Sequence, residues 1–199
     1  MDTPATVNNM TSPSTINLTG QLIIATPEMG DPRFNRAVIY ICSHDADGAM
    51  GIMINKGRGG RMLSDMLENI GIEGAVRVAD SPVLLGGPVD IDRGFVLHSA
   101  DYFKSETSLK LSDTLNLTST KDILEALVMD EAPEKAMLAV GYSGWSAGQL
   151  ERELQDNAWI VAGGDEALIF DANLDDKWTK ALASLGIKPE MLSGTGGSA

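Results

Sequence analysis

Basic residues are scarce in this sequence. Fifteen Lys and Arg stand against 28 Asp and Glu, so the 199-residue chain carries a net charge of −13. A field of that sign repels phosphate backbones and anionic lipid surfaces, so we predict no nucleic-acid partner and no membrane partner. The nearest approach to a basic cluster is Lys56, Arg58 and Arg61. Because glycines separate these residues, we interpret the segment as a solvated loop in preference to a phosphate contact.

Cysteine and long apolar runs are also scarce. Cys42 is the single cysteine, so no intramolecular disulfide can form, which suits a reducing compartment. No apolar run approaches the roughly 18 residues that span a bilayer. Residues 1–15 have neither the basic nor the apolar region of a signal peptide. These absences favour a cytoplasmic location.

The remaining composition is that of a folded protein with polar ends. The hydrophobic fraction is 43%, and a chain of this length can bury a core without a metal or disulfide. Residues 1–15, rich in Thr, Ser, Pro and Asn, predict a disordered leader, and 193–199 predict a disordered tail. Neither a linker nor a repeat interrupts residues 16–192, so we predict a single domain there.

Apolar runs and helical periodicity alternate irregularly along that domain. Strands are predicted at 22–25, 37–42, 51–55, 82–85, 94–98, 137–140 and 159–162. Helices are predicted at 61–70, 118–130, 146–156 and 175–185. The short apolar run 167–170 fits either type. Because the order is not a regular βαβ alternation, we predict an α+β fold with a mixed, mostly antiparallel sheet and about four flanking helices.

Three segments have unusual glycine placement. They are Gly48–Gly51, the segment from Gly86 to His98, and the segment from Gly141 to Glu151. With LTGQLIIATPEMGDPRFNRAVIYICSHDADGAMGIMIN, the stretches GGPVDIDRGFVLH and GYSGWSAGQLERELQDNAW resemble the YqgE/AlgH family of bacterial proteins over most of residues 18–185. The resemblance implies a compact α+β fold whose irregular mixed sheet curls toward a barrel. It carries over no defined biochemical activity, although the family's naming is linked to regulation of alginate synthesis.

The third segment invites comparison with the nucleophile elbow of serine hydrolases. That motif requires glycine two residues on either side of the serine, and here Trp145 follows Ser143 at that spacing. Both histidines precede Ser143, whereas the hydrolase order places the histidine after it. We therefore interpret the segment as a tight turn into a helix, with Ser146 as N-cap and Trp145 packed on the core.

The second segment resembles a phosphate loop only in its glycines. It lacks the G-x-x-x-x-G-K-[ST] pattern, because no lysine follows Gly86 and Gly87 at the required place. We interpret the two glycines as a strand end with positive φ and Pro88 as the residue that fixes the exit. The turn that follows holds Asp90, Asp92 and Arg93, which suits a polar ligand, a cation or a turn that is simply solvated.

Cys42 and His44 lie two residues apart, which places both side chains on one face of a strand. A thiolate beside an imidazole is a possible nucleophile, and Cys-x-His supplies two metal ligands. A zinc site needs two more ligands, and His98 is the only other histidine. We therefore favour a buried cysteine with a histidine at the strand end, and we predict no metal site.

The sequence holds no complete catalytic constellation. We predict a non-enzymatic cytoplasmic binding or regulatory protein whose glycine-rich turns rim a shared cleft for an unidentified protein or small-molecule partner, without a cofactor. The predicted ligand-binding residues are Gly86, Gly87, Arg93, His98, Tyr142 and Trp145. One alternative is a thiol-dependent enzyme that uses Cys42 with His44 or His98 as base. Another is a transcriptional regulator that binds DNA, which the net charge disfavours.

Overall fold

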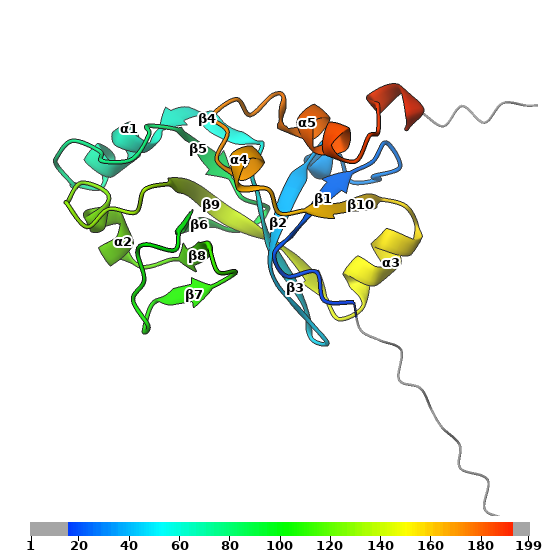
Figure 1. Ribbon diagram of the computed structural model, residues 1–199, viewed down its shortest axis with the longest axis horizontal. Coiled ribbons are helices and arrows are strands. Elements are labelled where there is room, and N and C mark those ends of the chain that lie inside the picture. Colours follow the sequence, from blue (N-terminus) through cyan, green and yellow to red (C-terminus); the bar gives the residue numbers. More distant parts are fainter. Residues whose placement is uncertain (1–15, 193–199) are drawn as a thin grey trace, which may run out of the picture.

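The computed structural model describes residues 16–192, which form one strongly twisted sheet with short helices around it (Figure 1). The segments 1–15 and 193–199, predicted as a disordered leader and tail, lie outside the described residues. Within residues 16–192, no helix has the length and apolar character needed to cross a membrane.

Ten strands form the sheet. They are β1 (Gln21–Ala25), β2 (Val38–Asp45), β3 (Gly48–Met53), β4 (Gly57–Met62), β5 (Pro82–Leu85), β6 (Val89–Ser99), β7 (Ser108–Lys110), β8 (Leu115–Thr118), β9 (Ala136–Ser146) and β10 (Trp159–Gly163). The main path runs β10-β1-β2-β3-β9-β6-β8-β7, and β5 pairs with β4 and β9. Among the described pairs, β5–β9 is parallel and the others are antiparallel. The predicted α+β fold with a mostly antiparallel, curled sheet is confirmed.

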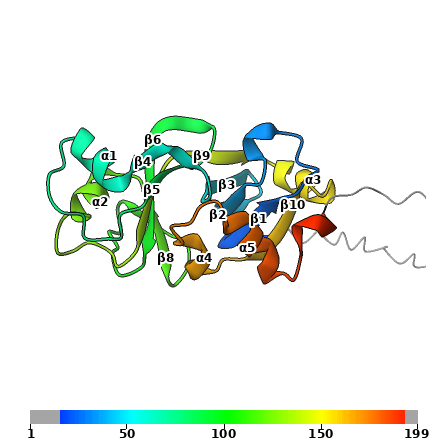
Figure 2. The same cartoon turned by 90° about the horizontal axis from the view of Figure 1, so that it is seen from above.

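Strand β9 holds the two halves of the molecule together. It crosses from the side of α2 to the side of α3 in Figure 1, and the view from above in Figure 2 shows the same span. Its first half pairs with β6, as in Phe95 opposite Ala139. Its second half pairs with β3, from Gly51 opposite Ser143 to Gly48 opposite Ser146. Segments distant in the sequence therefore meet along this one strand.

Five α-helices and two 3-10 turns cover the sheet in the described residues. They are α1 (Leu63–Asn69), α2 (Lys121–Ala126), α3 (Gln149–Gln155), α4 (Glu166–Ile169), α5 (Lys177–Ser184), and the 3-10 turns Pro32–Phe34 and Pro189–Met191. The α5 helix buries Trp178, Ala181 and Leu182. Their spacing of three and four residues places them on one face, which packs on the sheet.

The core is divided because the central strands bury both faces. On β2, Tyr40 and Cys42 belong to the central cluster, which also holds Trp178 of α5. Ile39 and Ile41 point the other way, into the cluster that holds Leu150 of α3. The alternation follows the two-residue period of a strand, and burial of both faces explains the unbroken apolar run there. A third cluster lies under α1 and α2.

The main difference from the sequence prediction lies at Gly141–Trp145. Where we predicted a tight turn into a helix, β9 continues to Ser146 because hydrogen bonding to β3 keeps the chain extended. The predicted N-cap is also wrong, since Gly148, with a left-handed φ of 69°, occupies that position. Ser146 ends the strand, and its hydroxyl donates to Gln149 Oε1 at 3.2 Å.

Other differences involve weak local signals. The sequence predicts no strand for β4, β7 or β8. The β4 sequence GRGGRM has little strand propensity, and its pairing with β5 decides its conformation. The helix predicted at 118–130 is shortened to α2: Thr118 belongs to β8, and the helix ends with Leu127 as C-cap. Of the undecided run 167–170, residues 167–169 lie in α4 and Phe170 is its C-cap; the Asp165 side chain caps the N-terminus of the helix.

Candidate functional site

The three glycine segments meet beside β9. A Cβ atom added at Gly86 would lie 2.3 Å from the Gly141 carbonyl oxygen, and one at Gly87 would lie 2.1 Å from the Tyr142 carbonyl carbon. Such gaps admit no side chain, so glycine allows the β5–β6 turn to lie directly on β9. Of these two, only Gly87 has a positive φ, and its 158° is nearly extended. Close approach, rather than the predicted positive φ at both positions, therefore requires glycine here.

A hollow of about 590 Å³ opens at this crossing, and we call it the hairpin hollow. Its lining comes from the tip of the β2–β3 hairpin, the start of β6 and the second half of β9. The residues are Ser43, Asp45, Asp47, Gly48, Ala49, Met50, Val89, Asp90, Arg93, Phe95, Tyr142, Gly144 and Trp145. The structure thus brings together three of the predicted site residues, Arg93, Tyr142 and Trp145. Gly86 and Gly87 support the crossing without lining the hollow.

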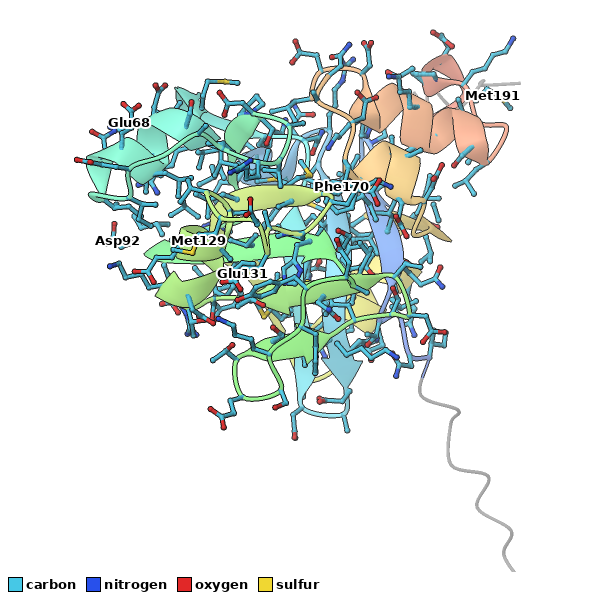
Figure 3. The ribbon with its side chains drawn as sticks, turned by 60° about the vertical axis from the view of Figure 1, so that its left-hand side comes forward. Glu68, Asp92, Met129, Glu131, Phe170 and Met191 are labelled. Atoms are coloured by element: carbon cyan, nitrogen blue, oxygen red, sulfur yellow. The ribbon has the colours of Figure 1, made fainter. Side chains whose placement is uncertain are left out.

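Arg93 is presented by an irregular start of β6. Val89 lies opposite Tyr142 and Gly94 opposite Val140, so five steps along β6 match two along β9. The surplus residues bulge outward, and Asp92 stands at the periphery of the molecule in Figure 3. The Arg93 guanidinium lies 5.2 Å from the Phe95 ring centroid, and its Nη2 donates to Ser119 Oγ at 3.0 Å.

The aromatic residues of the hollow differ in whether their polar groups remain available to a ligand. Trp145 Nε1 and Trp159 Nε1 both donate to Glu153 Oε2, at 2.9 and 2.7 Å. The Trp145 indole is therefore fixed and its N–H is not available to a ligand. Tyr142 packs its ring edge-to-face on Phe95, with centroids 5.7 Å apart. Its hydroxyl makes no hydrogen bond to any residue within 16–192.

Charge on the rim of the hollow is mostly negative. The carboxylates of Asp45, Asp47 and Asp90 stand against the single cation Arg93. An aromatic floor under a charged rim suits a polar or cationic group of a partner. In the described part of the chain, no three His, Cys, Asp or Glu side chains are grouped closely enough to hold a metal ion.

His98 lies away from the hollow, with none of its surface exposed. Its Nδ1 donates to the Ser99 carbonyl at 2.9 Å, and its Nε2 accepts from Thr118 Oγ1 at 2.9 Å. Burial lowers the pKa of His98, which favours the neutral ring that this pattern of bonds requires. Nδ1 is bonded within β6 and Nε2 joins β6 to β8, so both nitrogens are used and the structure brings His98 to no ligand site.

The structure separates Cys42 from His44, which we expected on one strand face. A register shift between Ile41 and Ser43 interrupts the alternation of β2. Cys42 packs in the central cluster, where burial raises the pKa of its thiol to about 12. His44 accepts at Nδ1 from the Leu18 amide, and its Nε2 lies 3.1 Å from Glu151 Oε1 on α3. This arrangement provides neither a thiolate nor a free base.

Ser143 likewise has a structural hydrogen bond. Its side chain is fully buried, and its hydroxyl donates to the Gly86 carbonyl oxygen at 3.2 Å. The bond ties the β5–β6 turn to β9. A serine nucleophile needs an exposed hydroxyl beside a base, and this residue has neither.

The decisive comparison is with protein-family models, where the AlgH-like family matches residues 22–190. The chain belongs to the AlgH-like family. It is 49% identical to a UPF0301 protein of Bradyrhizobium sp. over 92% of this chain and 88% of that protein. It is also 49% identical to a UPF0301 protein of Ruegeria pomeroyi, over 92% of this chain and the whole of that protein.

Comparison with solved structures supports the assignment of the chain to the AlgH-like family. The solution structure of the AlgH protein from Pseudomonas aeruginosa has a TM-score of 0.72 and 37% identity, covering 94% of this chain and 98% of that one. A crystal structure of a Corynebacterium diphtheriae protein has a TM-score of 0.66 at 19% identity, covering 84% and 86% of the two chains, and it supports the fold alone. The resemblance inferred from the three motifs is confirmed.

Sequence reasoning missed Asp45, Asp47 and Phe95 as parts of the hairpin hollow. Asp45 ends β2, and Asp47 lies in the two-residue turn that joins β2 to β3. The sequence indicates a turn here, but the turn lies near β6 only because β3 and β6 both pair with β9. Phe95 was assigned only to a strand, and its ring faces the hollow because Tyr142 packs against it.

Proposed function

We propose that this AlgH-like chain is a non-enzymatic cytoplasmic binding or regulatory protein that engages a protein or small-molecule partner at the hairpin hollow. One observation carries the proposal: all three glycine segments contribute residues to a single hollow. A close backbone crossing fixes the walls relative to one another, so little ordering is required on binding. The single, buried cysteine and the acidic composition suit the cytoplasm.

Arg93 and Tyr142 are the proposed contact residues. The Arg93 guanidinium has one hydrogen bond, to Ser119, and retains donors for a partner. The Tyr142 hydroxyl is free of hydrogen bonds within the described chain. Trp145 is proposed as a wall of the hollow, because its N–H is held by Glu153. Replacing Trp145 would disturb the core, so it is a poor choice for testing binding.

Site-specific photo-crosslinking in living bacteria tests the proposal. A photo-reactive phenylalanine analogue at Ala46, the exposed turn beside the hollow, is expected to give one defined adduct with the partner. The same analogue at Glu68, on the outer face of α1 (Figure 3), is the position control. The Arg93→Gln and Tyr142→Phe changes should each reduce the Ala46 adduct severalfold without changing the thermal unfolding midpoint.

The matched control for charge is Arg77→Gln. Arg77 is exposed and pairs with Asp130. It lies outside the hollow, so its loss should leave the adduct intact. Equal adducts from Ala46 and Glu68, or an adduct that persists in both Arg93→Gln and Tyr142→Phe, would overturn the proposed site.

A further inference from the structure

A second cleft of about 770 Å³ lies between β4 and α5 and shares no lining residue with the hairpin hollow. We call it the β4–α5 cleft. Its walls include Arg36 before β2, Asn55 and Lys56 after β3, and Asp175 and Trp178 at the start of α5. With Pro82 of β5, segments from four parts of the chain line it. Its volume falls in the range of small-molecule sites.

Arg36 is held in place before any ligand arrives. Its guanidinium carbon lies 5.0 Å from the centroid of the buried Trp178 ring, which restricts the side chain. Its backbone has a left-handed φ of 52°, an unfavourable conformation for a residue with a side chain. Asn55 Nδ2 donates to the Arg36 carbonyl at 2.8 Å and keeps this conformation. No carboxylate of residues 16–192 forms an ion pair with Arg36.

Lys56 supplies a second cation to the same cleft. Its Nζ donates to the Asn35 carbonyl at 2.8 Å, which leaves further N–H donors of the ammonium unused. Burial and the nearby charge of Arg36 lower the pKa of Lys56, while Asp175 opposes the shift. Two cations therefore repel each other across a cleft whose lining includes one carboxylate.

We propose that the β4–α5 cleft binds a small phosphate-bearing molecule through Arg36 and Lys56. A dianionic phosphate balances the two cations, and its oxygens accept from a guanidinium fork and an ammonium together. The net charge of −13 repels long polyanions, which selects a small phosphorylated molecule over a nucleic acid. Arg58 takes no part, because its Nη1 donates to the Ile91 carbonyl at 3.1 Å.

Titration of the ¹⁵N-labelled protein with pyrophosphate tests the site directly. Saturable amide shifts are expected at Gly57, Gly60 and Asn173, which line the cleft, and none at Gly144 in the hairpin hollow. Arg36→Gln and Lys56→Gln should each weaken binding at least about tenfold, because each removes a charge-assisted contact. Thermal unfolding verifies that both variants are folded.

The matched control is Arg33→Gln, which removes an equal charge from the neighbouring 3-10 turn. Arg33 pairs with Asp31 and does not line the cleft. The affinity of the Arg33→Gln variant for pyrophosphate should therefore equal that of the wild type. The absence of shifts up to about 10 mM pyrophosphate, or equal weakening by Arg33→Gln, would overturn the proposal. If citrate bound more tightly than pyrophosphate, the proposal of a phosphate ligand would be wrong and the cleft would be assigned a carboxylate ligand. If Arg36→Gln fails to fold, Lys56→Gln and the wild-type shift map still decide.

Discussion

Lys177 is an unusual residue in this protein because its amine is completely buried without a carboxylate partner. Its Nζ donates to the Ile54 carbonyl at 3.0 Å and to the Ile169 carbonyl at 2.6 Å. A neutral amine has two N–H groups, and both are used in these bonds. Burial lowers the pKa of Lys177 to about 7, so the neutral amine predominates only above that pH. The two bonds join α5 to the residue that follows β3 and to α4.

Stability should rise with pH because of this residue. Between about pH 7 and the ordinary lysine pKa of 10.5, the unfolded state binds a proton that the folded state lacks. Raising the pH removes that advantage, so the Lys177 contribution to the unfolding free energy increases by up to about 1.4 kcal/mol per pH unit. Urea unfolding of wild type and Lys177→Met between about pH 7 and 9 measures the difference in slope. Equal slopes would contradict a neutral Lys177.

Cys42 should be inert in the folded protein. Its side chain is 2% exposed, and burial raises the pKa of its thiol to about 12. Since the thiolate is the reactive form, labelling by an aromatic disulfide reagent should follow global unfolding and become rapid only in guanidinium chloride. Stoichiometric labelling of the native protein within seconds would revive the thiol enzyme. The sequence indicated a buried cysteine, but its separation from His44 depends on the register shift in β2.

At the scale of elements, the crossing of the β5–β6 turn over β9 organises the fold. Gly141, with φ of 74°, lies below this turn, and a Cβ atom there would be 2.6 Å from the Gly87 carbonyl oxygen. Because the contacting atoms are backbone atoms, no flexible side chain can move aside to make room for an added methyl group. The protein should therefore tolerate substitutions at exposed glycines, whereas substitutions at the crossing of the β5–β6 turn and β9 should destabilise it.

Replacing Gly86 by Ala should destabilise the protein by roughly 1–3 kcal/mol, because the new methyl group meets the Gly141 backbone. Gly163 on β10 is the matched control, since nothing lies within 4 Å of a Cβ atom built there. Gly163→Ala should stay within about 0.5 kcal/mol of the wild type. Urea unfolding midpoints compare the two variants. Equal midpoints would show that the crossing is not tightly packed in solution.

Strands with strong local signals were predicted well, and strands defined by their partners were not. The AVIYIC run gave β2 because apolar β-branched residues fill both of its faces. The GRGGRM and GYSGWS segments give β4 and the end of β9 although glycine and serine disfavour strands. Pairing with β5 and β3 provides the hydrogen bonds that local propensity lacks. Such pairing joins residues distant in the sequence, so a local window cannot detect it.

At the scale of the whole molecule, net charge limits the possible partners. With 28 acidic and 15 basic residues, the chain should not bind duplex DNA, even at about 50 mM salt where electrostatic binding is strong. Fluorescence anisotropy of a labelled duplex measures this. A salt-sensitive increase in anisotropy at micromolar protein would contradict the prediction and favour a transcriptional regulator. The β4–α5 cleft is a local exception to the acidic field, on a scale suited to a small anion.

The sequence by itself determined the family, the α+β class, the acidic character and most of the buried strands. These follow from composition, from two-residue and 3.6-residue periodicity, and from glycine motifs that are local in the chain. The tertiary structure alone decided which side chains meet. It brought Arg93 and Tyr142 to one hollow, placed Arg36 beside Lys56, and sealed His98 in the sheet. The physical reason is that β9 and α5 join segments far apart in sequence, and packing across them fixes the sites.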